Sequence, residues 1–345
     1  MTDRTATDAG VLRSQVEALA SQGLGATAAV VRAVPLAGGA SMETTAVDVT
    51  AAGETHALVV RRDMALNMAA TALTRPQEFW LLSAAHAAGV KCPRPRWVHA
   101  SPPPAFFVMD RCPGESVGRR VVKLPELAAA RKHLAREMGR EAAAIHRVPL
   151  DALDFLPRPD EGQTPAERVL AETRAAMDVL GRDNPVWETG LRWLSQHRPP
   201  PSGPSTLVHG DFRVGNLLVT PEGLEAVIDW EFAHVGDPIE DLGWPLVRDW
   251  RFENDAQRVG GVGSVDDLVA GYTENGGRAV DPTALHWWEI AGNLRWAVVC
   301  HAQAERHLSG RDRSVELASL GRKAAEIEWE LLDQIDQRRR AEARP

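Results

Sequence analysis

Asp211, Asn216 and Asp229 are the residues of this sequence whose types and spacing point most directly to chemistry. Asp211 and Asn216 are five residues apart on a predicted loop that leads into a strand, and Asp229 ends the next predicted strand. Side chains at these positions can face one cavity, and their carboxylate and amide oxygens are hard ligands of the kind that Mg²⁺ prefers. In phosphoryl transfer an Asp orients the attacking hydroxyl group, while an Asn and another Asp hold metal on the phosphates. The pattern therefore indicates metal-dependent phosphoryl transfer.

The motifs around these residues resemble those of a known family. Residues 209–216, HGDFRVGN, resemble the H-G-D-x-x-x-x-N loop of the aminoglycoside phosphotransferase family, a relative of the H-R-D-x-x-x-x-N loop of protein kinases. Residues 228–231, IDWE, resemble the metal-binding element of the same family, which stands where protein kinases have D-F-G. Residues 234–244, HVGDPIEDLGW, resemble its G-D-P-x-x-D-L-x-W element. Ordered elements at matching spacing are far more specific than an isolated H-G-D.

The resemblance implies a role for each motif residue. Asp211 would be the catalytic base, and Asn216 and Asp229 would be the magnesium ligands. Asp241 would brace the catalytic loop from the start of a helix. We expect His209 to support the loop structurally and to take no part in the chemistry.

The N-terminal part contains the elements that a kinase fold needs to position a nucleotide. Residues 36–44, which include Ser41, are rich in glycine and stand where a hairpin could cradle phosphate oxygens with its backbone amides. Alternation along the next strand places Val59 and Arg61 on one face. Glu78, on the following helix, is the predicted partner of Arg61. An ordinary surface Arg and Glu remain the alternative interpretation.

Arg61 departs from the usual pattern, because most kinases have Lys at this position and Arg is bulkier and bidentate. One branch of the family has an L-R-R stretch here, and it includes the kinase-like domain fused to some acyl-CoA dehydrogenases. This sequence has Val60, Arg61 and Arg62. Alternation favours Arg61 as the phosphate contact, and Arg62 stays the alternative.

Two further binding regions are predicted. The end of the last N-terminal strand should recognise adenine through backbone groups, with the candidate residues Met109, Asp110, Arg111 and Cys112. In the C-terminal third, residues 285–296 resemble helical motifs of the same branch. Trp287, Trp288 and Arg295 could contact the acceptor there, although aromatic residues at helical spacing more often belong to the core.

These elements together predict an α+β, two-lobed, protein-kinase-like fold. Strand patterns, one helix and turn signals fill residues 1–110, which predicts a small N-terminal lobe with a mixed sheet plus a helix. Residues 111–345 have mostly helical patterns and predict a larger C-terminal lobe with the catalytic loop, the metal site and an acceptor platform.

Composition excludes several classes of protein. The net charge of −8 is unfavourable for nucleic-acid binding, which needs a basic surface. No window approaches the roughly 20 apolar residues of a membrane span. Cys92, Cys112 and Cys300 are far apart and form no C-x-x-C pair, which fits a reducing cytoplasm. We therefore expect a cytoplasmic protein with neither a nucleic-acid nor a membrane partner; the sequence indicates no oligomeric state.

The predicted function is an ATP- and Mg²⁺-dependent phosphotransferase that moves the γ-phosphoryl group to a hydroxyl of a small-molecule acceptor. Similarity to the dehydrogenase-fused branch favours a hydroxyacyl thioester as acceptor. An aminoglycoside or other antibiotic kinase is one alternative. A nucleotide-binding pseudokinase is another, although Asp211, Asn216 and Asp229 are all present. A metallohydrolase is less favoured, because the sequence lacks H-E-x-x-H and clustered His ligands.

Overall fold

The computed structural model describes residues 2–36, 42–63, 72–101 and 105–342. Contacts within the chain divide it into two units. The first unit comprises Met1–Gly114, Val148–Leu156 and Glu225–Ala233. The second comprises Glu115–Arg147, Pro157–Leu224 and His234–Pro345.

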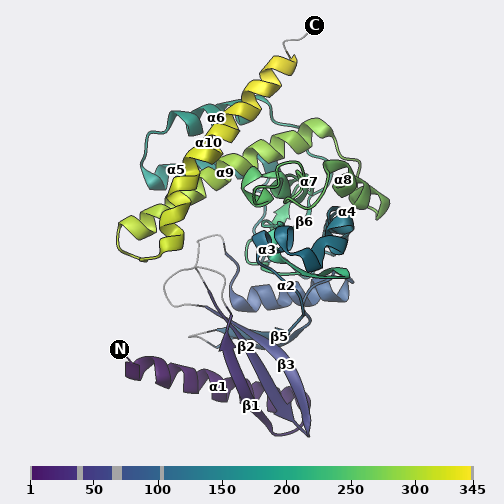
Figure 1. Ribbon diagram of the computed structural model, residues 1–345, viewed down its shortest axis with the longest axis vertical. Helices are drawn as coiled ribbons and strands as arrows, with labels where there is room; N and C mark the ends of the chain where they lie inside the picture. The colour runs from purple at the N-terminus through teal and green to yellow at the C-terminus, as the bar shows by residue number, and fades with distance from the viewer. Residues whose placement is uncertain (1, 37–41, 64–71, 102–104, 343–345) are drawn as a thin grey trace. The chain divides into compact units, whose positions relative to one another are not determined.

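The first unit is built on a five-stranded sheet with the strand order β1-β2-β3-β5-β4 (Figure 1). Its strands are β1 (Ala28–Pro35), β2 (Met42–Ala51), β3 (Glu54–Asp63), β4 (Pro95–His99) and β5 (Phe106–Asp110). Each neighbouring pair is antiparallel, so the sheet is not the mixed one that the sequence predicted. The reason is that β5 lies between β3 and β4 and runs opposite to both.

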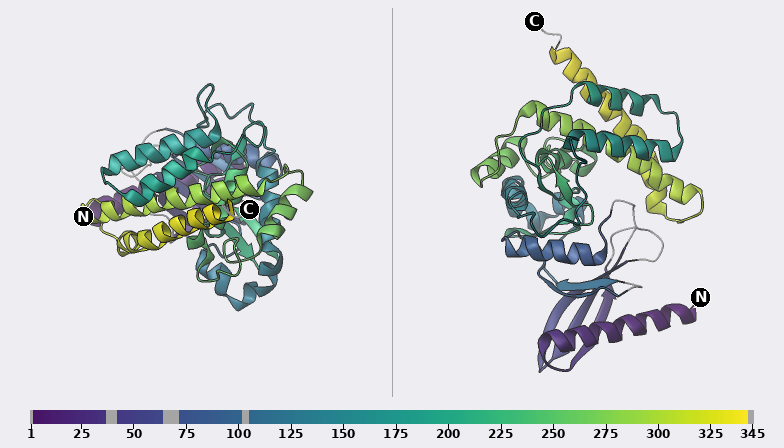
Figure 2. Two further views of the ribbon diagram at one scale, coloured as in Figure 1. Left: turned by 90° about the horizontal axis from the view of Figure 1, so that it is seen from above. Right: turned by 180° about the vertical axis from the view of Figure 1, so that it is seen from behind.

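Side chains alternate across this sheet and bury both of its faces. Helix α1 (Thr2–Leu24) packs Val16 and Ala20 into one core cluster with Leu58 and Val60 of β3 (Figures 1 and 2). Successive strand residues point to opposite faces, so Arg61 belongs to the other face. That face lies against helix α2 (Arg75–Ala87).

A well-defined start of α2 places Glu78 in its first turn. Thr74 caps the helix, and its side chain and that of Gln77 form a reciprocal capping box. Pro76 occupies the first turn, where its missing N–H costs nothing. Glu78 is therefore held at a fixed point of the helix and is fully buried.

The second unit is mostly helical. Its α-helices are α3 (Gly118–Lys123), α4 (Ala128–Ile145), α5 (Pro165–Leu180), α6 (Pro185–Gln196), α7 (Ile239–Gly243), α8 (Val265–Glu274), α9 (Pro282–Leu308) and α10 (Val315–Glu342). Short 3-10 helices are η1 (Pro125–Leu127), η2 (Val214–Asn216), η3 (Trp244–Leu246) and η4 (Arg248–Arg251). Strand β6 (Thr206–Val208) pairs with β9 (His234–Gly236), and β7 (Leu217–Thr220) pairs with β8 (Gly223–Val227). The boundary between the two units falls within β8.

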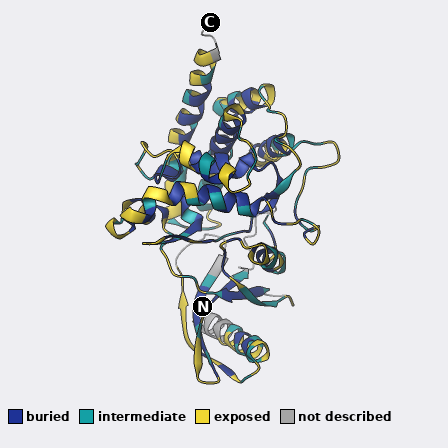
Figure 3. Ribbon diagram, turned by 90° about the vertical axis from the view of Figure 1, so that its right-hand side faces the viewer, coloured by how far each residue is buried: buried dark blue, intermediate teal, exposed yellow. Residues whose placement is uncertain are grey.

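Helix packing in the second unit forms two groups. Helices α5, α6, α9 and α10 lie side by side, as Figure 2 shows from above, and α10 alternates between buried and exposed residues in Figure 3. Helices α4 and α8 approach closely because glycines meet there. A Cβ atom at Gly139 would lie 2.1 Å from the Leu268 carbonyl oxygen, and one at Gly271 would lie 2.0 Å from that of Arg136. This contact brings the ends of α4 and α8 together behind the catalytic loop.

A sheet-based first unit followed by a helical second unit is the α+β arrangement that the sequence predicted. None of the helices in the described part of the chain is long and apolar enough to cross a membrane.

Candidate active site

The H-G-D loop is held by the carboxylate of Asp241. The backbone N–H groups of His209 and Gly210 donate to the two oxygens of this carboxylate, over 2.7 and 3.0 Å. Gly210 has φ +80°, a conformation that favours glycine, which explains the middle residue of the motif. Asp241 lies in α7, fully buried, and thus occupies the bracing position that the sequence predicted.

His209 and His146 support the same loop from inside. The His209 ring is fully buried and accepts the Asp211 N–H over 3.3 Å, a structural contact within the loop. His146, at the end of α4, lies 3.2 Å from Asp241 and 3.0 Å from the hydroxyl of Tyr272 on α8. The buried α4–α8 contact therefore fixes the carboxylate that holds the loop.

The Asp211 carboxylate is surrounded by hydrogen-bond donors. Its Oδ1 accepts from the Trp244 indole N–H over 2.6 Å and from Arg213 Nε over 2.9 Å. Its Oδ2 accepts from Asn216 Nδ2 over 2.6 Å. The side chain retains 14% of its exposure, so a small molecule could reach it. This is a rigidly placed, accessible carboxylate, which is what a general base requires.

The orientation of Asn216 leaves its carbonyl oxygen for another partner. The Nδ2 group donates both to the backbone oxygen of Asp211, over 2.9 Å, and to Asp211 Oδ2. These bonds assign the amide nitrogen to the Asp211 side. The oxygen on the opposite side is the hard ligand that a magnesium ion would use.

In the first unit, Arg61 is the centre of a buried charge cluster. Its guanidinium lies 3.4 Å from Glu78 and 2.7 Å from Asp229 Oδ1, with only 8% of its side chain exposed. Burial alone would lower the pKa of Arg61, but the carboxylates of Glu78 and Asp229 raise it well above its usual value. Arg61 therefore remains charged, and the structure places it beside Glu78 as the alternation predicted.

Two residues that the sequence did not single out complete this cluster. Arg75, fully buried, pairs with Glu78 and lies 3.8 Å from Glu231. Burial and, next, the nearby Asp229 carboxylate raise the pKa of Glu231 to about 8, although Arg61 opposes the shift. The i,i+3 spacing of Arg75 and Glu78 on one helix was the available signal.

Asp229 is the accessible edge of the cluster. Its side chain is 31% exposed, against 1% for Glu78. Its backbone has φ +68°, a conformation that is uncommon outside glycine and that clusters at functional sites. An exposed carboxylate beside a buried cation fits a divalent ion bound together with phosphate, because the metal needs an anionic oxygen and Arg61 can balance phosphate charge.

The predicted nucleotide-binding residues lie along and beyond β5. Met109 is buried, Asp110 pairs with Arg96 over 2.6 Å, and Arg111 pairs with Asp48 over 2.8 Å. The backbone N–H groups of Asp110 and Arg111 are bonded within the sheet region. In the described part of the chain, no partner accepts the N–H of Cys112, which makes it the backbone donor available to a base.

The thiol of Cys112 is protonated at neutral pH, because burial, together with the nearby Glu225 and Asp110, raises its pKa to about 11.

The glycine-rich segment lies between β1 and β2, and the Leu36 N–H donates to the Thr44 oxygen over 2.8 Å. Ser41 lies outside the described residues.

Arg61→Ala should weaken ATP binding far more than Arg62→Ala. Arg61 lies in the charge cluster, whereas the strand alternation turns Arg62 to the other face. A hydrogen bond to a charged group contributes about 1.5–3 kcal/mol, so ATP affinity should fall roughly tenfold to a hundredfold. Titration calorimetry with magnesium ATP measures this, and Arg61→Lys, which keeps the charge, should fall between. A larger loss in Arg62→Ala would show that the register is reversed.

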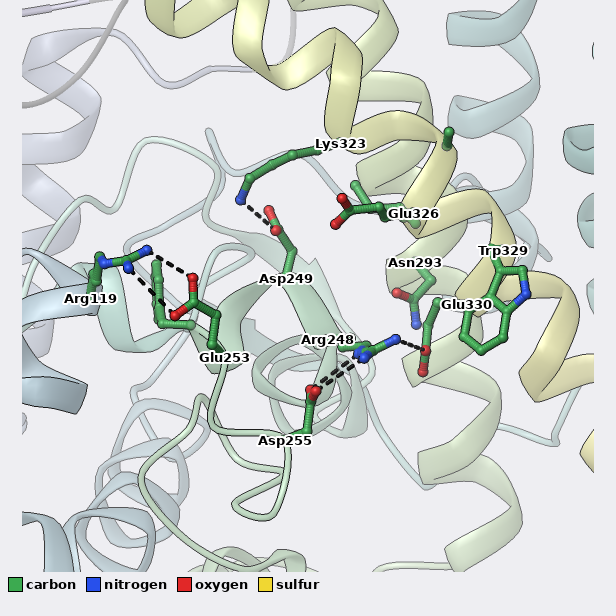
Figure 4. Close-up of a pocket in the computed structure, with 13 residues that line it drawn as sticks. Arg119, Arg248, Asp249, Glu253, Asp255, Asn293, Lys323, Glu326, Trp329 and Glu330 are labelled. Carbon is green, nitrogen blue, oxygen red and sulfur yellow. Dashed lines mark hydrogen bonds and ion pairs between the residues drawn. The ribbon is translucent and has the colours of Figure 1, made fainter.

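The three candidate acceptor residues are Trp287, Trp288 and Arg295, all on α9. Trp287 and Trp288 are 1% and 3% exposed, and the Trp287 indole donates to the Leu194 oxygen over 3.0 Å. They belong to the core between α9 and α6, as aromatic residues at helical spacing commonly do. Arg295 pairs with Glu240 over 2.7 Å and lies over the Trp244 ring. None of the three is among the described residues that line the cavity in Figure 4.

A cavity of about 600 Å³ opens elsewhere in the second unit (Figure 4). Its walls come from α3, the segment around η4, α9 and α10, and they include Arg119, Arg248, Asp249, Phe252, Glu253, Asp255, Asn293, Lys323, Glu326, Trp329 and Glu330. Each basic side chain of this wall forms an ion pair: Arg119 with Glu253, Arg248 with Asp255 and Glu330, and Lys323 with Asp249.

The cavity also carries one carboxylate that could receive a ligand. Glu326 forms no ion pair with any described residue, and its carboxylate stands clear of the other labelled side chains in Figure 4. The Asn293 Oδ1 atom is buried without a hydrogen-bond partner in the described part of the chain. Phe252 and Trp329 add apolar surface, and Trp329 is 59% exposed. Asp211 does not line the cavity. Trp250 follows the cavity residue Asp249 in the chain, and its ring packs against Arg213, which binds Asp211.

The chain belongs to the phosphotransferase enzyme family, whose model matches residues 32–282.

Among curated proteins, the chain is similar to acyl-CoA dehydrogenase family member 10 of Mus musculus, with 28% identity over 253 residues. That match covers 65% of this chain and 22% of the mouse protein. Acyl-CoA dehydrogenase family member 11 of Gallus gallus is 25% identical over 66% of this chain and 31% of its own length. Viomycin phosphotransferase of Streptomyces vinaceus is 32% identical over 40% of this chain and 48% of its own. The chain thus spans less than a third of the dehydrogenase-family relatives.

Solved structures establish the fold. A protein of Ralstonia eutropha assigned to the aminoglycoside phosphotransferases superimposes with a TM-score of 0.68 at 19% identity, over 92% of this chain and 97% of that one. Spectinomycin phosphotransferase, solved with ADP and spectinomycin, gives a TM-score of 0.61 at 15% identity, over 93% and 98%. The protein-kinase-like, two-lobed α+β fold that the sequence predicted is confirmed.

Proposed function

We propose that this protein transfers the γ-phosphoryl group of ATP to a hydroxyl group of a small molecule, with magnesium as the required metal. The observation that carries the proposal is the Asp211 carboxylate, held by three donors on a loop that Asp241 braces. Family membership supports the reaction class. ADP in a structural relative supports an adenine nucleotide.

Each site residue has a role in this proposal. Asp211 is the base, and Asn216 and Asp229 are the magnesium ligands, as the motif resemblance implies. Arg61, held by Glu78, would contact the phosphates. The region of Cys112 would receive the adenine. We propose residues 1–110 and 111–345 as the two lobes.

The reaction balances with these residues. Asp211 accepts the proton of the acceptor hydroxyl as its oxygen forms a bond to the γ-phosphorus. The bond between that phosphorus and the bridging oxygen breaks, and ADP leaves with the bonding electrons. Bound magnesium would supply neutralisation of the charge that builds up on the phosphate oxygens. The low exposure of Asp211 limits competition from water.

We propose a hydroxyacyl thioester as the acceptor and the cavity in Figure 4 as the place that holds its acyl part, with the reacting hydroxyl group outside the cavity at Asp211. The similarity to acyl-CoA dehydrogenase family proteins supports this class. Phe252 and Trp329 offer surface for an acyl chain. The ion-paired basic side chains of the wall offer little to an anion, so the anionic part of such a thioester would remain outside the cavity.

An antibiotic kinase is the second candidate, and a specific observation favours it. The labelled wall has five carboxylates against three basic side chains, and Glu326 has no ion-pair partner among the described residues. Such a wall suits an amine-bearing acceptor, because each ammonium group needs a carboxylate as it loses water. The partial similarity to viomycin phosphotransferase points the same way.

Steady-state kinetics on both acceptor classes should separate the candidates. We expect hydroxyacyl-CoA thioesters to react with kcat/KM of about 10⁴ M⁻¹s⁻¹ or more, and kanamycin and viomycin to react far more slowly. Glu326→Gln should leave the KM for the thioester unchanged, whereas it should raise the KM for an amine-bearing acceptor. Efficient phosphorylation of either antibiotic, with the thioesters inert, would contradict the thioester proposal.

A cytoplasmic location is part of the proposal. ATP at useful concentration is found inside cells, and the reaction consumes it. No disulfide joins any two of Cys92, Cys112 and Cys300, as suits a reducing compartment.

A further inference from the structure

We propose that Trp244 and Arg213 form a clamp that orients the catalytic carboxylate, and that both are positioning residues for the transfer step. The inference rests on the proposed function, in which Asp211 is the base. Trp244 and Arg213 lie within the sequence motifs, but neither was singled out there. The clamp is defined as these two side chains together with Trp250, on which Arg213 rests.

The two donors converge on one oxygen of Asp211. Trp244 Nε1 and Arg213 Nε both donate to Oδ1, over 2.6 and 2.9 Å, while Oδ2 accepts from Asn216. The terminal torsion of an Asp side chain is otherwise broad, so the carboxylate plane is set by its partners. With Oδ1 taken by two donors, Oδ2 is the oxygen placed to receive an acceptor proton.

Trp244 is held in place by a chain of charged residues. Arg295 lies over its ring, 5.1 Å from the centroid, and pairs with Glu240 over 2.7 Å. Burial alone would raise the pKa of Glu240, but His234, 3.2 Å away, and Arg295 lower it to about 2, so Glu240 remains an anion. Arg295 therefore supports the indole from behind, with 29% of its own side chain exposed.

Arg213 is held by an aromatic cluster that reaches the cavity wall. Its guanidinium lies 4.6 Å from the Trp250 ring centroid, and Trp250 contacts the rings of both Trp244 and Trp296. Trp296 donates to Asp249 over 2.8 Å, and Asp249 lines the cavity beside Phe252. A continuous set of packed side chains thus joins the cavity wall to the clamp.

The test replaces each donor while keeping its shape. Trp244→Phe removes the N–H and keeps an aromatic ring. Trp193→Phe is the matched control, because Trp193 is similarly buried, 3% exposed against 8%, and lies on α6 away from Asp211. Arg213→Met removes the charged donor, and Arg213→Lys restores one. We expect kcat to fall about tenfold to a hundredfold in Trp244→Phe and Arg213→Met, with the KM for ATP unchanged. Arg213→Lys should recover part of the loss.

A spectroscopic measurement needs no acceptor. In ¹H–¹⁵N spectra, the resonance that Trp244→Phe removes should lie at unusually low field, as expected for an indole bonded to a carboxylate. It should move upfield in Asp211→Asn, while the resonance assigned to Trp193 stays in place. An unshifted Trp244 resonance would show that the bond to Asp211 is absent.

The kinetic outcomes separate the clamp from the function on which it rests. If Asp211→Asn is inactive and Trp244→Phe matches Trp193→Phe, the clamp is wrong and the base assignment stands. If Asp211→Asn keeps the wild-type rate, the base assignment fails and the clamp fails with it. Equal losses of kcat in Trp244→Phe and Trp193→Phe would indicate a purely structural role.

Discussion

Asp211→Asn should abolish phosphoryl transfer while changing ATP affinity little. In our account this carboxylate acts on the acceptor hydroxyl, and the nucleotide is bound by other residues. General-base help alone contributes about 10² to 10⁴ in rate, so turnover should fall by at least that factor. The measurement is steady-state transfer alongside titration calorimetry with magnesium ATP.

Asp237→Asn is the matched control for this variant. Asp237 is a buried carboxylate in the same unit, and it accepts from Ser202 and the Ile239 N–H rather than touching the catalytic loop. It should lose stability but keep turnover. If Asp211→Asn retained more than about a tenth of wild-type turnover, the general-base role would be untenable.

Asn216→Ala and Asp229→Ala should each remove the magnesium-dependent stabilisation by ATP. A ligand at 100 times its dissociation constant stabilises the native state by about 2.7 kcal/mol, and this gain should vanish when the metal is lost. Thermal unfolding with ATP, with and without magnesium, measures it. Wild-type protein in a chelator provides the reference for metal-free binding.

The two variants should differ in one respect. Removing Asp229 also frees Arg61 from its nearest ion-pair partner, so Asp229→Ala could bind ATP without metal through that cation. Asn216 touches no basic residue in the described part of the chain, and Asn216→Ala should simply bind ATP weakly. Full magnesium dependence in both variants would remove these residues from the metal site.

Local patterns predicted much of the site. Strand alternation placed Arg61 toward Glu78, and the structure has this pair at 3.4 Å. The helix-start signal at Pro76 located α2, whose capping box then fixes Glu78. Motif spacing located the loop that Asp241 braces. In each case the partners are defined by a strand period, a helix turn or a fixed motif spacing.

Contacts between distant elements could not be predicted in this way. Trp244 reaches Asp211 from 33 residues away, and nothing in its local pattern indicates which carboxylate its indole will meet. Trp287 and Trp288 have the same helical spacing whether they face a core or a pocket. The sheet pairing of β5 also depends on tertiary packing, because strand patterns do not specify neighbours.

The fate of the terminal phosphate of ATP tests the proposed phosphoryl transfer most directly. The wild-type protein and Asp211→Asn are incubated with γ-radiolabelled ATP, magnesium and a panel of hydroxyl acceptors that includes hydroxyacyl thioesters and antibiotics. We predict that the wild type moves the label into a phosphorylated acceptor, that a chelator stops the reaction, and that Asp211→Asn forms no labelled product. Label that stays in ATP across the whole panel, while ATP still stabilises the protein, would instead indicate a nucleotide-binding module without transfer activity.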